Sequence, residues 1–130
     1  DLIVSNPPYF SNSLKCPEKK RNMARHNDSL LLTDLLNNSA KIVSPHGRIA
    51  IILPAEQEIE LTNLCKTFSL YIIRKTYVLP IPNANPKRIL VELSKDLPLQ
   101  KNTSSLTIEI SRHQYTTEFC ALTKEFYLKM

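Results

Sequence analysis

The chain opens on Asp1-Leu2-Ile3-Val4-Ser5-Asn6-Pro7-Pro8-Tyr9-Phe10, and this stretch decides how the rest is interpreted. Leu2 to Val4 is a short apolar run with β-branched residues, which predicts a buried strand. The run stops at two consecutive prolines, which lack N–H donors and fix φ, so a central strand cannot continue through them. The chain therefore leaves the sheet extended, with an amide and an aromatic ring at the end of a strand. Ligands of α/β sheets bind at this edge.

The composition limits the classes of protein that this chain can represent. Its 130 residues make one domain or less, and 42% apolar residues are enough for a core. There is no long apolar run and no signal-peptide pattern, so we expect a cytoplasmic protein without a membrane partner. Cys16, Cys65 and Cys120 form no CxxC pair, so we expect neither a metal site nor a disulfide framework. A net charge of +5 is compatible with nucleic acid without being diagnostic of it.

Apolar periodicity predicts alternating helices and strands after the first strand. A helix is capped by Asp28 or Ser29 and continues at helical spacing to Val43. The continuous apolar run Arg48–Leu53 predicts a buried parallel strand. A second helix, a third strand and a proline-rich loop follow, at Glu56–Ser69, Leu70–Leu79 and Pro80–Pro86.

The remaining segments complete an α/β fold with a mixed sheet. Arg88–Leu93 predicts a strand that must return antiparallel, and Ser94–Ser105 predicts a long linker. Leu106–Ile110 alternates, which indicates a half-exposed edge strand or a hairpin arm. Thr116–Lys129 predicts a terminal amphipathic helix. The expected fold therefore has parallel strands, a C-terminal antiparallel hairpin, helices on the faces and right-handed crossovers.

The opening motif resembles the Asn-Pro-Pro-Tyr motif of S-adenosylmethionine-dependent amino-methyltransferases. Several other stretches are similar to the bacterial valine-tRNA adenine-N6 methyltransferase family. They are Ala24-Arg25-His26, the helix from Leu30, Gly47–Ala55, Asn85-Pro86-Lys87-Arg88 and Glu125-Phe126-Tyr127-Leu128. The resemblance covers the whole chain. It implies the C-terminal half of a Rossmann-like methyltransferase fold, and a substrate adenosine next to a tRNA anticodon.

The resemblance assigns catalysis to Asn6, Pro7, Pro8 and Tyr9. The exocyclic amine of adenine is a poor nucleophile, because its lone pair is delocalised into the ring. The Asn6 side-chain carbonyl and the Pro7 backbone carbonyl can accept hydrogen bonds from that amine and aim its lone pair at the methyl group. Tyr9 offers a face on which an unpaired base can stack. Catalysis would then consist mostly of positioning, with Asn6 also next to the cofactor and no metal required.

The scarcity of glycine indicates which part of the protein binds the cofactor. A Rossmann-type cofactor site needs a glycine-rich turn, and this chain has a single glycine, Gly47. The chain also begins in the middle of the motif. We therefore expect residues 1–130 to be the C-terminal, target-base portion of a methyltransferase domain whose N-terminal cofactor-binding portion is absent. S-adenosylmethionine is the cofactor expected for the full-length parent, and we do not expect this fragment to bind it.

Two basic segments are expected to contact the substrate. Ser11–Asn27 follows the motif without apolar periodicity, and it reads either as a phosphate-contacting segment or as a solvated loop. The Pro80–Lys87 loop should share the edge of Asn6, because the strands from Leu2 and Leu70 should run parallel. It either reaches the base and a flanking phosphate or is only a rigid connection. The substrate-binding candidates are Phe10, Lys19, Lys20, Arg21, Arg25, His26, Asn83, Asn85, Lys87 and Arg88.

Three possible functions and one mode of self-association are expected. The preferred activity is methylation of an unpaired tRNA adenosine at N6. A protein-glutamine N5-methyltransferase uses the same tetrapeptide, but the lysine-rich loop would then have no purpose. A non-catalytic RNA-binding module is the alternative from another class. In the fragment, the Leu2–Ser5 edge lacks a neighbour, so we expect self-association through it, most simply as a two-fold dimer.

Overall fold

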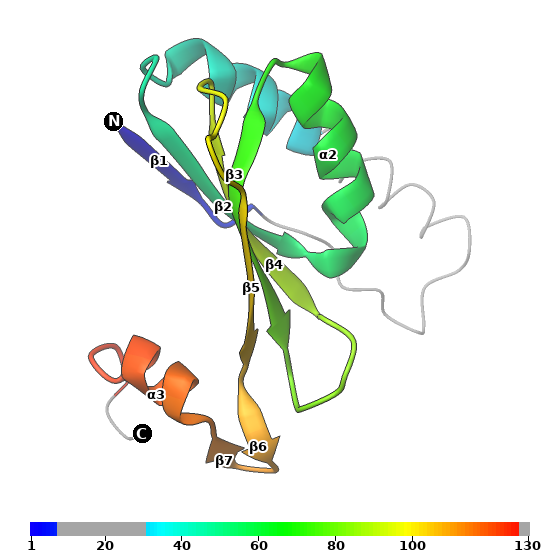
Figure 1. Cartoon of the computed structure of the whole chain (residues 1–130), viewed down its shortest axis with the longest axis vertical. Helices are drawn as coiled ribbons and strands as arrows, with labels where there is room; N and C mark the ends of the chain where they lie inside the picture. Colours follow the sequence, from blue (N-terminus) through cyan, green and yellow to red (C-terminus); the bar gives the residue numbers. More distant parts are fainter. Residues whose placement is uncertain (8–30, 128–130) are drawn as a thin grey trace.

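The computed structural model describes residues 1–7 and 31–127 (Figure 1). Its main feature is a mixed sheet with the strand order β1-β2-β4-β3-β5. The strands are β1 (Leu2–Ser5), β2 (Arg48–Pro54), β3 (Tyr71–Leu79), β4 (Arg88–Ser94) and β5 (Asn102–Thr107). β1 runs parallel to β2 and β5 parallel to β3, whereas β4 is antiparallel to both of its neighbours. The predicted α/β fold with a mixed sheet is confirmed.

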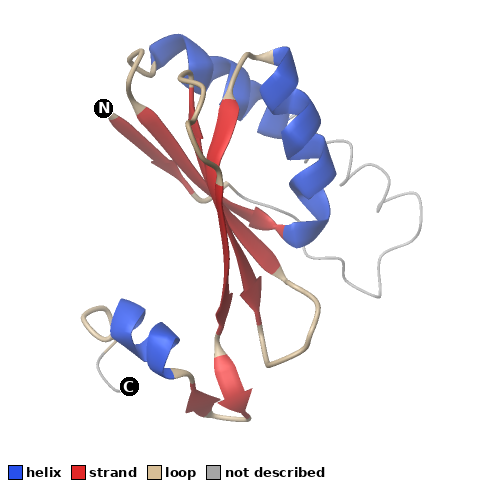
Figure 2. Cartoon of the chain, in the orientation of Figure 1, coloured by secondary structure: helices blue, strands red, loops and turns tan. Residues whose placement is uncertain are grey.

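Two helices cover one face of this sheet (Figure 2). One spans residues 31–42, and the other is α2 (Glu58–Thr67), which follows the short 3-10 helix η1 (Ala55–Gln57). The chain ends in a small hairpin, β6 (Glu109–Ser111) with β7 (Gln114–Tyr115), followed by α3 (Thr117–Thr123). These last elements lie beyond the end of the sheet, away from the two covering helices. None of the helices in the described ranges has the length and apolar character needed to cross a bilayer.

The core lies between the two helices and one face of the sheet. Alternate residues of a strand point to opposite faces, and in β2 and β4 one alternating set is buried. Leu36 and Leu61 come from the two helices and are fully buried against this face. The core cluster consists of Leu32, Leu36, Val43, Ile49, Ile51, Leu53, Leu61, Cys65, Leu70, Ile89, Val91 and Leu93. Helical spacing in the sequence predicts that Leu61, Leu64, Cys65 and Phe68 share one face of the second helix. That face is confirmed, since Leu61 and Cys65 belong to the core cluster, and Leu64 and Phe68 pack against it.

The first strand is less buried than predicted. Leu2 and Val4 are 64% and 71% exposed, and only Ile3 packs against the core. Among the described residues β1 pairs with β2 alone, so one edge of it is open. The sheet face opposite the helices carries Leu2 and Val4 with no described element over it. The prediction of a buried first strand is therefore wrong for this structure, whereas the expectation that Leu2–Ser5 lacks a neighbour on one side holds among the described residues.

The segment after β4 also differs from expectation. The predicted linker Ser94–Ser105 is wrong at both ends, because Ser94 closes β4 and β5 begins at Asn102. The predicted run Leu106–Ile110 is divided between β5 and β6. Residues 102–105 are polar and exposed, so they carry no burial signal. They are held as a strand by backbone pairing with β3 and by a 2.9 Å hydrogen bond between the Thr76 and Ser104 hydroxyls.

The terminal helix is shorter than the predicted Thr116–Lys129. Thr116 is its N-cap, since its side chain accepts a hydrogen bond from Phe119 N, and the helix ends at Thr123. The sequence predicts an apolar face formed by Phe119, Leu122, Phe126 and Tyr127. This face does not pack as expected, because Leu122, Phe126 and Tyr127 are each more than half exposed. The predicted start of the first helix, at residue 28 or 29, lies outside the described residues.

Candidate functional site

The carboxyl ends of the parallel strands meet at one edge of the sheet, which we call the strand-end edge. Asn6 and Pro7 follow β1 there, with the Asn6 side chain exposed and Pro7 half-buried. Ser5 pairs with Ile51, so β2 runs three residues further, to Pro54. The strand-end edge therefore carries the exposed Asn6 amide directly after β1, followed by Pro7.

Much of the predicted site lies outside the described residues. This holds for the rest of the motif and for the basic segment that follows it. The residues concerned are Pro8, Tyr9, Phe10, Lys19, Lys20, Arg21, Arg25 and His26. Their assignments stay predictions.

The loop between β3 and β4 lies at the strand-end edge, as the parallel direction of β1 and β3 requires. Its ends are held by backbone hydrogen bonds from Lys87 N to Val78 O, at 2.9 Å, and from Ala55 N to Lys87 O, at 3.1 Å. Asn83 sits at φ 61°, in the left-handed region that asparagine tolerates better than most residues. The loop is therefore tied to the end of β2 and shaped by a local turn.

The predicted substrate-binding residues of this loop differ in exposure. Asn83, Asn85 and Lys87 are exposed, whereas Arg88 is half-buried and donates from Nη1 to Lys87 O at 3.0 Å. No hydrogen bond among the described residues joins the loop to Asn6. The structure thus brings the two predicted groups to the same edge of the sheet without direct contact between them.

Sequence reasoning missed a polar cluster next to this edge, which we call the Glu58 cluster. It consists of Glu58, at the start of α2, and of Lys75 and Tyr77 on β3. Glu58 Oε1 accepts a 2.6 Å hydrogen bond from the Tyr77 hydroxyl and a 3.0 Å bond from Lys75 Nζ. The side chains of Lys75 and Glu58 are only 18% and 26% exposed. Strand alternation alone places Lys75 and Tyr77 on one face of β3, but it does not show that Glu58 meets them there.

The contacts within the Glu58 cluster shift the ionisation of all three groups. Burial alone would raise the pKa of the Glu58 carboxyl, but hydrogen bonds from Tyr77 and Lys75 and the charge of Lys75 outweigh it and lower that pKa. Burial opposes the charged form of Lys75, yet the Glu58 carboxylate raises the Lys75 pKa overall. The hydrogen bond to Glu58, together with burial, raises the pKa of Tyr77. Near neutral pH the cluster is thus a carboxylate with two donors.

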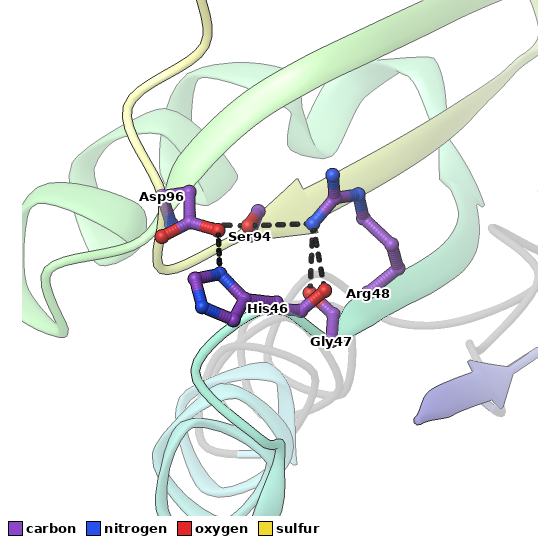
Figure 3. A network of polar contacts seen from close by, with 5 residues as sticks. All are labelled: His46, Gly47, Arg48, Ser94 and Asp96. Atoms are coloured by element: carbon purple, nitrogen blue, oxygen red, sulfur yellow. Dashed lines mark hydrogen bonds and ion pairs between the residues drawn. The ribbon is translucent and has the colours of Figure 1, made fainter.

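A second polar network lies at the opposite end of the sheet (Figure 3). Arg48 Nη1 donates to the backbone oxygens of His46 and Gly47 and to Ser94 Oγ, at 3.0–3.2 Å. His46 Nδ1 lies 2.8 Å from Asp96 Oδ2, although the His46 side chain is 89% exposed. This network connects the turn before β2 to the end of β4. It lies at the end of the sheet opposite Asn6, because Arg48 pairs with Leu2 at the start of β1.

Comparison with known proteins gives close relatives and one informative fold neighbour. No protein-family model matches the chain. The tRNA1(Val) (adenine(37)-N6)-methyltransferases of Parabacteroides distasonis and Trichodesmium erythraeum are 54% and 49% identical to it over 130 residues. The matches take in 100% and 99% of this chain but only 55% and 54% of those proteins. The chain therefore spans about half the length of the curated relatives it matches.

The fold is also found in a solved methyltransferase-type structure. A crystal structure of a predicted O-methyltransferase from Agrobacterium tumefaciens superposes with a TM-score of 0.65 at 17% identity. That match covers 95% of this chain and 50% of the other one. The resemblance expected from the sequence, to a Rossmann-like methyltransferase of the valine-tRNA adenine-N6 type, is confirmed by these comparisons.

Proposed function

We propose that this chain is the target-base portion of an enzyme that transfers a methyl group from S-adenosylmethionine to the N6 amine of an unpaired adenosine in tRNA. The observation that carries the proposal is the exposed Asn6 followed by Pro7 at the strand-end edge, within a chain that is 54% identical to a tRNA adenine-N6 methyltransferase. The relatives are about twice as long, so we assign cofactor binding mainly to the remainder of the protein.

In this proposal Asn6 and Pro7 hold the amine of the target base. The side-chain carbonyl of Asn6 and the backbone carbonyl of Pro7 each accept one N–H of the adenine amine. Proline has no N–H and a fixed φ, so its carbonyl keeps its direction. Two acceptors on one amine orient the nitrogen lone pair toward the incoming methyl group, and they stabilise the positive charge that develops on nitrogen.

We propose that this chain does not by itself bind the methyl donor. S-adenosylmethionine supplies the activated methyl group when bound, and its adenosine and methionine ends need close backbone contacts of the kind that glycines permit. The only glycine of the chain, Gly47, is buried at the other end of β2, far along the strand from Asn6. We therefore expect the chain alone to show no measurable binding of this cofactor in isothermal titration. Micromolar binding of S-adenosylmethionine to this chain would refute the assignment of cofactor binding to the remainder of the protein.

The substrate assignment rests on the charge of the chain and on the shape of the loop between β3 and β4. Lys87 is an exposed cation at the strand-end edge, and Asn83 and Asn85 offer exposed amides on the same loop. Phosphate contacts of this kind position an RNA, whereas stacking and amide contacts read an unpaired base. With a tRNA substrate, we expect the protein to act in the cytoplasm.

The direct test is methylation by the complete protein with an RNA stem-loop that contains an unpaired adenosine. Asn6→Ala should lower the turnover rate by on the order of 100-fold, because the orienting acceptor is lost. Asn38→Ala is the matched control, since it removes an exposed amide on the helix over residues 31–42. Equal rates for the Asn6→Ala and Asn38→Ala proteins would refute the catalytic assignment.

We also propose that the isolated chain self-associates through β1. The open edge of β1 is flanked by the exposed side chains of Leu2 and Val4, and the strand contains no lysine, whose charge would hinder pairing with another chain. The simplest assembly is a two-fold dimer in which the Leu2–Ser5 edges pair antiparallel. Sedimentation at low micromolar concentration tests this, and a clean monomer with an ordered first strand would refute it.

A further inference from the structure

The Glu58 cluster is connected to the loop between β3 and β4 by a closed circuit of contacts. Tyr77, which donates to Glu58, directly precedes Val78, whose carbonyl accepts the Lys87 N–H. The carbonyl of Lys87 in turn accepts the N–H of Ala55, three residues before Glu58 in the chain. The circuit therefore runs from the start of α2 to β3, on to Lys87, and back to the corner between β2 and α2.

The circuit fixes the backbone of Lys87 and leaves its side chain free. The Lys87 amide donates to Val78 O, and the Lys87 carbonyl accepts from both Ala55 N and Arg88 Nη1. The Lys87 ammonium is exposed and has no ion pair or hydrogen bond to any described residue. An exposed ammonium without a partner among the described residues can bind a phosphate oxygen, and because the Lys87 backbone is already fixed, only its side chain has to be ordered on binding.

The location of Lys87 agrees with that use. Its neighbour Arg88 pairs with Pro54, the last residue of β2, and Ser5 pairs with Ile51 of the same strand. Lys87 therefore lies just past the end of β2, and β2 separates it from β1, the strand that leads to Asn6. In the proposed complex the RNA backbone beside the target base would extend across this edge.

We propose that Glu58, Lys75 and Tyr77 are positioning residues that hold Lys87 in place to contact a phosphate of the RNA substrate. This inference rests on the proposed function and adds a role for three residues that do not touch the substrate. Tyr77 and Lys75 bind one carboxylate oxygen, so the corner of α2 cannot move relative to β3 unless that contact breaks. Loss of the Tyr77 hydroxyl then loosens the Ala55–Lys87 and Lys87–Val78 hydrogen bonds.

The first arm of the test needs no RNA. Tyr77→Phe deletes one hydroxyl, and Tyr71→Phe on the same strand is the matched control, since Tyr71 is exposed. Amide hydrogen exchange should become about 10-fold faster at Ala55 and Lys87 in Tyr77→Phe and remain unchanged in Tyr71→Phe. Unchanged protection in both variants would show that the Glu58 cluster does not hold the loop, and the inference would be wrong.

The second arm measures binding of an RNA stem-loop to the complete protein by fluorescence anisotropy. Lys87→Ala should weaken binding about 5-fold and reduce the salt slope by about one. Tyr77→Phe should weaken it about 3-fold, and the double variant should be no weaker than Lys87→Ala alone, because both remove the same contact.

The outcomes separate this inference from the proposed function. If the unmodified protein binds no RNA, the proposed function fails and the inference with it. If it binds RNA but the effects of Tyr77→Phe and Lys87→Ala add independently, only the inference fails. Adding Lys87→Arg to the Tyr77→Phe protein should not restore RNA binding, because the arginine side chain is attached to the same loosened backbone.

Discussion

Replacing Gly47 with alanine tests how tightly the start of the sheet is packed. An added Cβ would lie 2.7 Å from Val43 Cγ2, 2.8 Å from Ser44 Oγ and 3.0 Å from the backbone oxygen of Asp1. Real Cβ contacts are almost never shorter than 3.0 Å. The oxygen of Asp1 cannot move freely, because it accepts a 3.0 Å hydrogen bond from Arg48 N where β1 begins to pair with β2.

The size of the effect follows from these contacts. Overpacking of a buried site costs about 1–3 kcal/mol, whereas alanine gains about 0.4–1 kcal/mol over glycine through the unfolded chain. Mid-range values of about 2 and about 0.7 kcal/mol leave a net loss for Gly47→Ala of about 1.3 kcal/mol. With a urea m-value of about 2 kcal/mol per molar, the unfolding midpoint should fall by roughly 0.6 M.

The assay is urea unfolding followed by circular dichroism, with Ser44→Ala as a rescue variant. Ser44 Oγ has no hydrogen bond to the described residues, so its removal alone should cost little and should relieve one of the contacts with the new Cβ. The double variant should therefore be less destabilised than Gly47→Ala. A Gly47→Ala protein as stable as the unmodified chain would refute the reasoning, since the surrounding atoms would then have moved without cost.

Three further outcomes follow from the polar and sulfur groups of the described residues. In the folded protein the pKa of the Glu58 carboxyl lies below its ordinary value of 4.5. The ionised carboxyl therefore adds its full stability above pH 4.5, and this stability is lost as the pH falls through the folded pKa. Unfolding free energies measured at decreasing pH should show this loss, and the pH dependence should disappear in Glu58→Gln. Burial raises the pKa of the Cys65 thiol to about 11, so iodoacetamide at pH 8 should modify Cys65 far more slowly than the partly exposed Cys120. Peptide mass mapping measures the two rates, and equal rates would contradict the burial of Cys65. Ser94→Ala removes a fully buried hydroxyl that accepts a hydrogen bond from the Arg48 guanidinium. It should lower the free energy of unfolding by about 1–2 kcal/mol in the same urea assay. An unchanged free energy of unfolding would mean that water replaces the hydroxyl.

Sequence patterns predicted the parts of the fold in which burial decides the structure. Arg48–Leu53 and Arg88–Leu93 were each predicted within one residue of β2 and β4, because strands that contribute to the core are rich in apolar, β-branched residues. Leu61 and Cys65 were placed on the buried face of the second helix for the same reason. The antiparallel return of β4 was also predicted, since the loop before it is too short for a helical crossover.

The rest could not be predicted because backbone pairing or polar contacts decide it. β5 begins with Asn102–Ser105, where no apolar pattern marks a strand and only hydrogen bonds to β3 define it. The Glu58 cluster joins residues from two elements, and only the packed structure shows that Tyr77 reaches Glu58. The strand-end edge was correctly expected from strand direction, but the contact between Ala55 and Lys87 was not.

The position of β4 between β2 and β3 has a consequence for the order in which the sheet assembles. β3 and β4 are neighbours in the chain and can pair early, whereas β1 must find β2 across more than forty residues of intervening sequence. β2 has no partner on its inner side until β4 arrives, and β4 arrives with β3 attached. The β3–β4 hairpin should therefore dock as one cooperative unit, and β1 should join late and open first. Asn6 and Pro7 are thus carried by the strand that can detach at the lowest cost, while the loop with Lys87 belongs to the unit that persists longest.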